Sequence, residues 1–397
     1  MLPTRRQRMS LPTPTATIRS RSMQFSAQQE RALQSVSDWL KGDDQVFRLF
    51  GFAGTGKTTL ARHIGADLYA AFTGKAAYVM RQKGCPAQTI HSLIYNPRDK
   101  STLRLKQLEN QLLELAGIDS PEAETEATLL KQKIREEHNN LKRPLFTLNL
   151  DSELRYAKLL VIDECSMVDE EMATDLLSFG TKILVLGDPA QLPPVRGTGF
   201  FTNAEPDFLL TEIHRQAREN PILDLATRIR EDSRLPSSHP CLVPEATMKL
   251  AINCDQVIVG RNHTRRAGNR RIREELGFTG PTPQVGEKVV CLRNNHEVGI
   301  LNGATYEVTE ADDCWLQLDG NIEVIVHREP FVGEEVDWWN IKQAELFDFG
   351  YVLTCHKAQG SQWDKVGVIN EAYAFRHDRW RWLYTAVTRA AETLWVA

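Results

Sequence analysis

The stretch GFAGTGKTT at residues 51–59 decides the fold of this chain. It fits the phosphate-binding pattern G-x-x-x-x-G-K-[ST], in which Gly51, Gly56, Lys57 and Thr58 occupy the fixed positions. Glycines let backbone N–H groups close on phosphate oxygens, the lysine offers a point charge to the β- and γ-phosphates, and the threonine offers a hydroxyl to Mg²⁺. The alternative is a chance glycine turn in front of a helix.

The sequence on either side of this loop argues against a chance turn. The apolar run VFRLF (46–50) predicts a buried strand, and TTLARHIGADLYA (58–70) predicts a helix. A strand, a glycine loop and a helix in this order form a nucleotide-binding unit, because the helix N-terminus attracts phosphate. We therefore expect the chain to bind a nucleoside triphosphate through Gly51, Ala53, Gly54, Thr55, Gly56, Lys57, Thr58 and Thr59.

Length and composition indicate an ordinary globular protein. The chain has 397 residues, enough for two or more domains, and no apolar run approaches the length of a membrane span. Its net charge of −4 excludes a globally basic nucleic-acid coat, although a single groove can still be lined with Lys and Arg. The seven cysteines form no CxxC pair, which argues against a disulfide framework or a zinc site and predicts a reducing, cytosolic compartment.

The first 22 residues have a composition of their own. They contain five arginines and no acidic residue, with no apolar core for a secretory signal. One interpretation is a basic arm that touches nucleic acid. The other, which we favour, is a disordered basic leader upstream of a start at Met23.

Short apolar runs recur in the first half of the chain. Near-continuous apolar strands that alternate with helices predict a doubly wound α/β sheet. Two of the runs end in an acid, Asp163 and Asp188, and ligands in such sheets bind at the carboxyl ends of strands. The predicted strands are VFRLF (46–50), LYAAF (68–72), KLLVID (158–163) and KILVLGD (182–188).

Residues 98–140 interrupt this alternation. The 3-4-3 spacing of Leu105, Leu108, Leu112 and Leu115 predicts a helix with one apolar stripe. After a break at GIDSPE (117–122), a charged stretch at 125–138 predicts a second helix that returns the chain. We expect a helical hairpin inserted into the first domain.

A second α/β set follows, with a stretch of different texture inside it. Residues 284–335 hold short alternating runs between NN, NG, DD and DGN turns, which predicts a small β-barrel inserted into the second domain. The predicted strands of the set itself are DFLL (207–210), QVIVG (256–260), FGYVLT (349–354), KVGVI (365–369) and TLWVA (393–397).

VIDECSM (161–167) is the second chemical element of the sequence. An apolar strand delivers Asp163 and Glu164 side by side at its carboxyl end. Asp163 is suited to hold the Mg²⁺ water shell and Glu164 to take a proton from an attacking water, so the two carboxylates have different tasks. A helix-capping acid pair is the alternative, which the neighbouring phosphate loop disfavours.

Three further residues are candidates for contacts to the γ-phosphate. Gln191 lies in the proline-stiffened turn LGDPAQLPPV (186–195), where its amide would contact both the γ-phosphate and the attacking water. Arg215 and Arg389 carry forked, permanently charged groups suited to developing phosphate charge. Taken singly, each arginine is more simply explained as a partner in a surface salt bridge.

The motifs occur in a recognisable order. GFAGTGKTT, DECSM, GDPAQLPPV, HRQ, TCHKAQGSQ and YTAVTRA together resemble the superfamily 1B DNA helicases, the RecD-like and phage Dda-like group. FSAQQERA (25–32), FTGKAA (72–77) and TIHSLIY (89–95) resemble three more motifs of that family. The resemblance runs from about residue 25 to the C-terminus.

The resemblance implies an α/β fold of two RecA-like parallel-sheet P-loop domains, 1A and 2A. It places a helical insert, 1B, in the first domain and a small SH3-like β-barrel insert, 2B, in the second. The implied division is a leader at 1–22, domain 1A at 23–97 and 141–200, insert 1B at 98–140, domain 2A at 201–283 and 341–397, and insert 2B at 284–340.

The resemblance also implies an activity. A protein of this family couples Mg²⁺-ATP hydrolysis between domains 1A and 2A to 5′-to-3′ movement on single-stranded DNA and to unwinding of tailed duplex DNA. The expected partners are DNA and possible replication or recombination proteins, with no membrane. The expected working unit is a monomer in the cytoplasm of a bacterium or a phage-infected cell.

Residue roles follow from the same resemblance. Thr58 and Asp163 would hold the metal, Gln29 would read adenine, and Gln359 and Gly360 would lie between the nucleotide and DNA sites. Catalysis would rest on Lys57, Glu164, Gln191, Arg215 and Arg389, and DNA contact on Thr73, His91, Thr354 and His356. Without the motif context, His91 and His356 are more simply core-facing histidines. Few aromatic residues stand beside the DNA motifs, so the base-stacking and pin residues stay unassigned.

Three hypotheses for function remain at this point. The first is the helicase, and the second is a DNA-stimulated ATPase that remodels protein–DNA complexes without productive unwinding. The third is a P-loop enzyme for a small substrate, such as a kinase, which the two-domain order of motifs argues against. The basic run at 261–277 predicts either a DNA contact or, as we favour, a solvated helix that pairs with Glu274 and Glu275.

Overall fold

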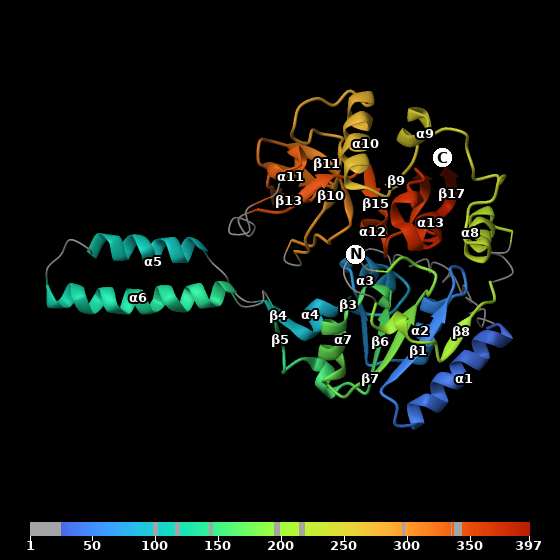
Figure 1. Cartoon of the computed structure of the whole chain (residues 1–397), viewed down its shortest axis with the longest axis horizontal. Coiled ribbons are helices and arrows are strands. Elements are labelled where there is room, and N and C mark those ends of the chain that lie inside the picture. Colours follow the sequence, from blue (N-terminus) through green and yellow to red (C-terminus); the bar gives the residue numbers. More distant parts are fainter. Residues whose placement is uncertain are drawn as a thin grey trace, which may run out of the picture.

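A computed structural model describes most of the chain as two α/β units with two insertions. Figure 1 shows the two units one above the other, with a pair of helices projecting sideways from the lower, first unit. None of the helices in the described ranges is long and apolar enough to cross a membrane. The described residues are 25–97, 102–115, 120–142, 146–193, 199–213, 219–295, 298–334, 336 and 344–397, so the predicted leader lies outside them.

The first unit is built on a six-stranded parallel sheet. Its order is β3-β2-β6-β7-β1-β8, and every neighbouring pair is parallel. Apolar clusters cover both faces, as expected for a doubly wound sheet. The strands are β1 (Val46–Gly51), β2 (Leu68–Ala71), β3 (Ala87–Thr89), β6 (Leu159–Asp163), β7 (Lys182–Gly187) and β8 (Phe208–Leu210), and the helices are α1 (Ala27–Lys41), α2 (Lys57–Ile64), α3 (Gly74–Gln82), α4 (Ile90–Ile94) and α7 (Glu170–Leu177).

Two strand assignments were wrong. FGYVLT (349–354) was predicted as one strand, but Phe347–Phe349 and Val352–Thr354 are separate strands in different sheets. DFLL (207–210) was predicted to open the second α/β set, but β8 pairs in parallel with β1, with Phe50 opposite Leu209. The sequence could not reveal this, because an apolar run does not say which sheet it joins. The first sheet therefore extends past residue 200, the predicted end of domain 1A.

The predicted helical hairpin is confirmed. Helices α5 (Thr102–Leu115) and α6 (Pro121–Lys142) pack against each other and project away from the first unit (Figure 1). Strands β4 (Tyr95–Pro97) and β5 (Phe146–Leu148) pair antiparallel at the base of the hairpin. The hairpin is thus joined to the first unit through a short two-stranded neck.

The second unit is built on a four-stranded parallel sheet of order β15-β9-β16-β17. Its central core includes Trp382, which is fully buried and stacked on Phe375. The strands are β9 (Gln256–Val259), β15 (Val352–Thr354), β16 (Trp363–Val368) and β17 (Ala390–Val396), and the helices are α8 (Pro221–Asp232), α9 (Met248–Ile252), α10 (Asn262–Glu275), α12 (Cys355–Ala358) and α13 (Arg379–Val387).

The insertion in the second unit is an antiparallel sheet of order β13-β12-β11-β10-β14. Within the described residues, an isolated bridge joins Val326, just after β13, to Glu345, just before β14, but β13 and β14 do not pair, so closure into the predicted barrel is not observed. Its last strand lies beyond residue 340, the predicted end of the insert. The elements are β10 (Lys288–Cys291), β11 (Thr305–Ala311), β12 (Trp315–Leu318), β13 (Ile322–Ile325), α11 (Glu329–Val332) and β14 (Phe347–Phe349).

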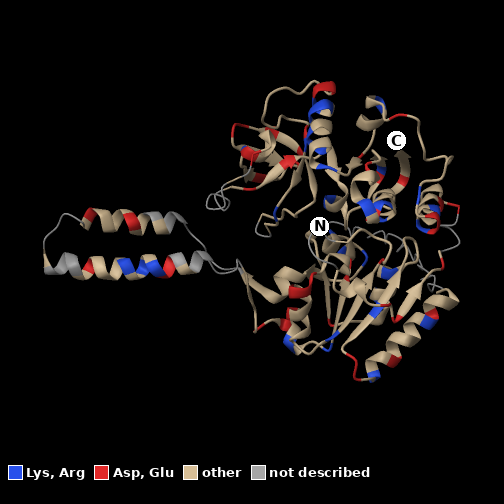
Figure 2. Cartoon of the chain, viewed as in Figure 1, with Lys and Arg blue, Asp and Glu red and all other residues tan. Residues whose placement is uncertain are grey.

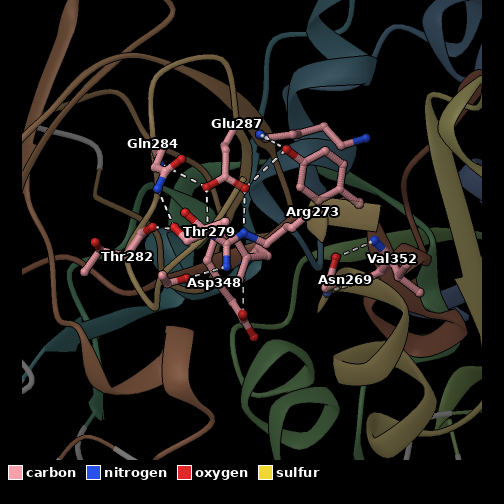
Figure 3. A network of polar contacts seen from close by, with 12 residues as sticks. Asn269, Arg273, Thr279, Thr282, Gln284, Glu287, Asp348 and Val352 are labelled. Carbon is pink, nitrogen blue, oxygen red and sulfur yellow. Dashed lines mark hydrogen bonds and ion pairs between the residues drawn. The ribbon is translucent and has the colours of Figure 1, made fainter. Parts of the chain in front are cut away.

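Helix α10 ties this insertion to the second unit. Arg265, Asn269 and Arg273 recur every four residues and are all buried. Arg273 pairs with the buried Glu287 at 2.6 Å, as Figure 3 shows, while Asn269 exchanges two hydrogen bonds with the backbone of Val352. The chain leaving for the insert and the chain returning from it are thus held by one face of the helix.

The prediction of a solvated α10 is therefore only half correct. Figure 2 shows basic residues along the helix and acidic residues at its end. The exposed Arg270 does approach Glu274, at 3.9 Å, as expected. Arg265 and Arg273 instead point into the protein, because each meets a buried carboxylate, Asp348 or Glu287.

Candidate nucleotide site between the two domains

The phosphate loop is folded onto the start of α2. Gly54 and Gly56 have φ angles of 79° and 82°, in the left-handed region that glycine adopts without a steric penalty. The Nζ of Lys57, the first residue of α2, donates to the carbonyl oxygens of Gly51 at 2.6 Å and Phe52 at 3.2 Å. The lysine charge is therefore already held over the loop in which a phosphate would lie.

Thr58 and Asp163 meet beside this loop. The Thr58 hydroxyl donates to Asp163 Oδ2 at 2.9 Å, and the backbone N–H of Glu164 donates to Asp163 Oδ1 at 2.9 Å. A hydroxyl and a carboxylate are oxygen ligands of the kind that Mg²⁺ takes together with water and nucleotide phosphates. The donor set therefore fits the metal predicted for this position.

Glu164 occupies a strained and electrostatically perturbed position. Its φ of 55° lies in the left-handed region, which costs a non-glycine residue free energy. Burial raises the pKa of its carboxyl group, and the positive charge of Arg389 opposes that rise. Strain and a raised pKa at one carboxylate are typical of a catalytic base.

Residues from both units line one cavity of about 190 Å³. A larger cavity of about 690 Å³ lies between α10 and α11, but it contains none of the predicted nucleotide residues, so volume does not single out the site. Lining the smaller cavity are Ala53, Gly54, Lys57, Thr58, Asp163, Glu164, Asp188 and Gln191 of the first unit, together with Gly360 and Arg389 of the second.

Arg389 is buried and prepositioned. Its guanidinium donates to Thr385 O at 3.0 Å, Thr388 Oγ1 at 3.2 Å and Ser361 O at 3.3 Å, all within the second unit. No salt bridge of Arg389 occurs among the residues that the structure describes, so the surface ion-pair alternative is wrong for it. Arg215, its predicted companion, lies outside those residues.

Gln191 brings an unused acceptor to the cavity. Its side-chain Oε1 is buried and has no hydrogen-bond partner within the described ranges. A buried amide oxygen without a partner costs about 1–3 kcal/mol, so such an atom usually awaits a ligand or water. Gln191 therefore fits the predicted contact to an attacking water.

Gln29 lies directly against the phosphate loop. Its Nε2 donates to Thr55 O at 3.0 Å, and its Oε1 accepts from the backbone N–H of Ser26 in a capping box at the start of α1. The side chain is thus fixed by the first turn of α1. Its role in reading adenine stays a prediction.

Gln359 and Gly360 lie where the second unit touches the first. Gln359 Nε2 donates to Leu192 O at 2.7 Å. A Cβ added to Gly360 would lie 3.0 Å from Thr73 Oγ1 and 3.2 Å from Ala76 Cβ, so only glycine allows this close approach without a shift. Both residues therefore help to set the spacing of the two units.

The predicted DNA residues are distributed over both units. Thr73 caps α3 by accepting from the N–H of Ala76 at 3.1 Å, and the buried Thr354 ends β15. The His91 ring lies 5.7 Å from the rings of both Tyr95 and Phe146, at the base of the helical hairpin. Two aromatic side chains near these motifs are exposed: Phe146 at 44% and Tyr78, which follows FTGKAA in the chain, at 47%.

Both histidines are partly buried beside aromatic rings. His356 lies 5.9 Å from the Phe375 ring, and burial lowers the pKa of both His91 and His356. Burial therefore disfavours the charged form of both imidazoles. Their contact with DNA stays a prediction.

Sequence reasoning missed the residues that join the two units. Tyr384 and Thr385 hydrogen-bond to the first unit, although only the arginine of YTAVTRA was singled out. Both side chains are fully or almost fully buried. A tyrosine and a threonine within an apolar helix look like core residues in the sequence, and only the spatial partners reveal the interface.

Two protein families match this chain, one in its first half and one at its C-terminal end. Residues 24–237 match the family described as an AAA domain, and residues 349–397 match the UvrD-like helicase C-terminal domain. The chain is 28% identical to the ATP-dependent RecD2 DNA helicase of Deinococcus radiodurans over 91% of its own length. This chain belongs to the superfamily 1B helicases.

The chain matches only part of the length of these relatives. The chain spans 48% of the length of the RecD2 protein. It is also 27% identical, over 60% of its own length, to a probable conjugal transfer protein TraA of Sinorhizobium fredii, of which it spans 24%.

Solved helicases share the fold. A structure of two Pif1 helicases at forked double-stranded DNA superposes with a TM-score of 0.55 at 20% identity, covering 94% of this chain and 92% of that one. Bacteroides Pif1 bound to single-stranded DNA gives the same TM-score at 19% identity, with the same coverage. The superfamily 1B chain therefore has two RecA-like parallel-sheet units with an antiparallel insertion.

Proposed function

We propose that this protein is an ATP-dependent DNA helicase that moves 5′-to-3′ on single-stranded DNA and unwinds tailed duplexes. The observation that carries the proposal is the cavity shared by the two units, where Lys57, Glu164 and Gln191 of the first face Arg389 of the second. A nucleotide held by both walls would draw the units together when it binds and release them after hydrolysis.

The residues of this cavity divide the chemistry among themselves. Mg²⁺-ATP, when bound, supplies the phosphoanhydride bond and the charge that neutralises the phosphates. Lys57 would exchange its loop carbonyls for phosphate oxygens, and Thr58 and Asp163 would hold the metal. Glu164 takes a proton from the water that Gln191 orients. Three of the five guanidinium N–H groups of Arg389 are occupied by its own unit, so the guanidinium is fixed before the reaction begins.

DNA would lie across both units beside this cavity. Thr73 borders Gly360 at the interface, so a strand held by Thr73, His91, Thr354 and His356 would experience every change in the spacing of the units. The Pif1 relative was solved with single-stranded DNA and another at a forked duplex. By analogy, single-stranded and tailed duplex DNA are the proposed substrates, and a monomer is the proposed working unit.

The domain division is part of the proposal. Residues 23–97 and 141–210 would form domain 1A, with β8 included, and 98–140 would form insert 1B with the strand-splitting element. The antiparallel sheet through β14 would be the SH3-like insert 2B, and residues 211–283 and 350–397 would form domain 2A.

DNA-stimulated ATP hydrolysis tests this function. We expect single-stranded DNA to raise ATP turnover at least tenfold. Lys57→Ala should abolish turnover while DNA affinity stays within about threefold of wild type, because Lys57 would contact the phosphates of ATP rather than the DNA. A turnover that DNA does not change would contradict the proposal and favour an enzyme for a small substrate. DNA-stimulated turnover without strand separation would instead favour remodelling of protein–DNA complexes.

A further inference from the structure

Helix α13 of the second unit is docked on the first through the hydroxyl of Tyr384. This oxygen accepts the backbone N–H of Ala53 in the phosphate loop at 2.9 Å and donates to Asp188 Oδ2, at the end of β7, at 2.6 Å. The second carboxylate oxygen of Asp188 accepts the N–H of Ala190 at 3.0 Å. One side chain of the second unit therefore joins the phosphate loop to the turn that carries Gln191.

The next residue makes a second contact with the same turn. Thr385 Oγ1 accepts the backbone N–H of Leu192, the neighbour of Gln191, at 2.8 Å. The carbonyl oxygen of Thr385 accepts Nε of Arg389 at 3.0 Å. Thr385 thus holds the Gln191 turn with its side chain and the guanidinium of Arg389 with its backbone.

These contacts are more than packing. Tyr384 is 1% exposed and Thr385 is fully buried, and burying a hydroxyl without hydrogen bonds costs free energy. Phenylalanine and valine would fill the same space without that cost. The cost of burying the two hydroxyls is offset because they form hydrogen bonds with two backbone N–H groups and one carboxylate of the opposite unit.

We infer that Tyr384 and Thr385 are positioning residues, which align the phosphate loop and Gln191 of the first unit with Arg389 of the second when the units are docked as in this structure. The inference rests on the proposed ATP hydrolysis for its consequence but not for its geometry. Removal of either hydroxyl would keep every predicted catalytic side chain in the protein but would make the position of one unit's groups relative to the other's less well defined. A misplacement of that kind lowers kcat more than it weakens nucleotide binding.

Tyr384→Phe and Thr385→Val in the full chain test this inference. We expect kcat for DNA-stimulated ATP hydrolysis to fall tenfold or more, with KM and the ADP dissociation constant within about threefold of wild type. Thr385→Ser keeps the hydroxyl and should restore most of kcat. Tyr373→Phe is the matched control, because Tyr373 lies in the same unit and is 57% exposed. Loss of its hydroxyl should leave kcat unchanged.

Amide hydrogen exchange without nucleotide separates this inference from the helicase assignment. We expect faster exchange of the Ala53 amide in Tyr384→Phe and of the Leu192 amide in Thr385→Val, because each loses its acceptor. Unchanged exchange at both amides, or a kcat within twofold of wild type in both variants, overturns the inference. Faster exchange in a protein whose wild type does not hydrolyse ATP would uphold the docking contact and reject the proposed function.

Discussion

Thr58 and Asp163, 105 residues apart in the chain, meet through a 2.9 Å hydrogen bond beside the phosphate loop. The contact forms because α2 begins at the carboxyl end of the sheet, where β6 also ends. Hydroxyl and carboxylate oxygens side by side at a sheet edge are suited to one divalent cation.

Asp163→Asn should raise the Mg²⁺ concentration needed for half-maximal ATP turnover at least tenfold, because the amide brings no charge to the cation. Thr58→Val should act in the same direction, and Thr58→Ser should not, since serine keeps the hydroxyl. A Mg²⁺ titration of ATPase activity measures all three. Equal Mg²⁺ dependence in wild type and Asp163→Asn would show that the metal lies elsewhere.

Stability should depend on pH through Lys75. This lysine of α3 lies 4.2 Å from the Trp363 ring centroid across the interface, and burial, with the neighbouring Lys288, lowers its pKa to about 8. Between pH 8 and 10.5 the unfolded chain holds a proton that the folded chain has lost, so this group stabilises the fold as pH rises. We expect the free energy of unfolding to increase by about 1–3 kcal/mol across that window, a range that allows for the partial exposure of the side chain.

Lys75→Met removes the titration and keeps the length of the side chain. Urea titrations at pH 7, 8, 9 and 10 give the free energy of unfolding of both proteins. We expect the free energy of unfolding of wild type, relative to that of the variant, to increase as pH rises. A difference that stays constant, or that shifts toward the variant, would contradict the assignment of this pH dependence to Lys75.

The buried ion pair of Arg273 and Glu287 should be costly to break. The two side chains are 8% and 0% exposed, and loss of one partner leaves an unpaired buried charge at a cost of about 3–5 kcal/mol. Arg273→Met should therefore destabilise the chain strongly in urea, and adding Glu287→Gln should recover part of the loss. Arg228→Met, in an exposed pair with Asp224, is the control and should cost about 1 kcal/mol or less. Strictly additive losses at the buried pair would show that the two charges do not interact.

The sequence was sufficient for residues with a strong local signature. The phosphate loop, Asp163 and Glu164 follow from a glycine pattern and from apolar runs that end in acids, and the structure places them around one cavity. Leucine spacing likewise predicted the hairpin of α5 and α6.

Residues whose role depends on spatial partners could not be found in this way. β8 is too short and apolar to indicate which sheet it joins. Arg265 and Arg273 read as surface charges until the structure brings Asp348 and Glu287 to them. Tyr384 resembles a core residue, because its two partners lie more than 190 positions away.

The central claim is that nucleotide hydrolysis between the two units drives movement along DNA in one direction. Strand separation of duplexes with a 5′ or a 3′ single-stranded tail, with wild type and Glu164→Gln in the presence of Mg²⁺-ATP, tests it most directly. We predict that wild type unwinds only the 5′-tailed duplex and that Glu164→Gln unwinds neither. Unwinding of the 3′-tailed duplex, or strand separation by Glu164→Gln at the wild-type rate, would contradict the account.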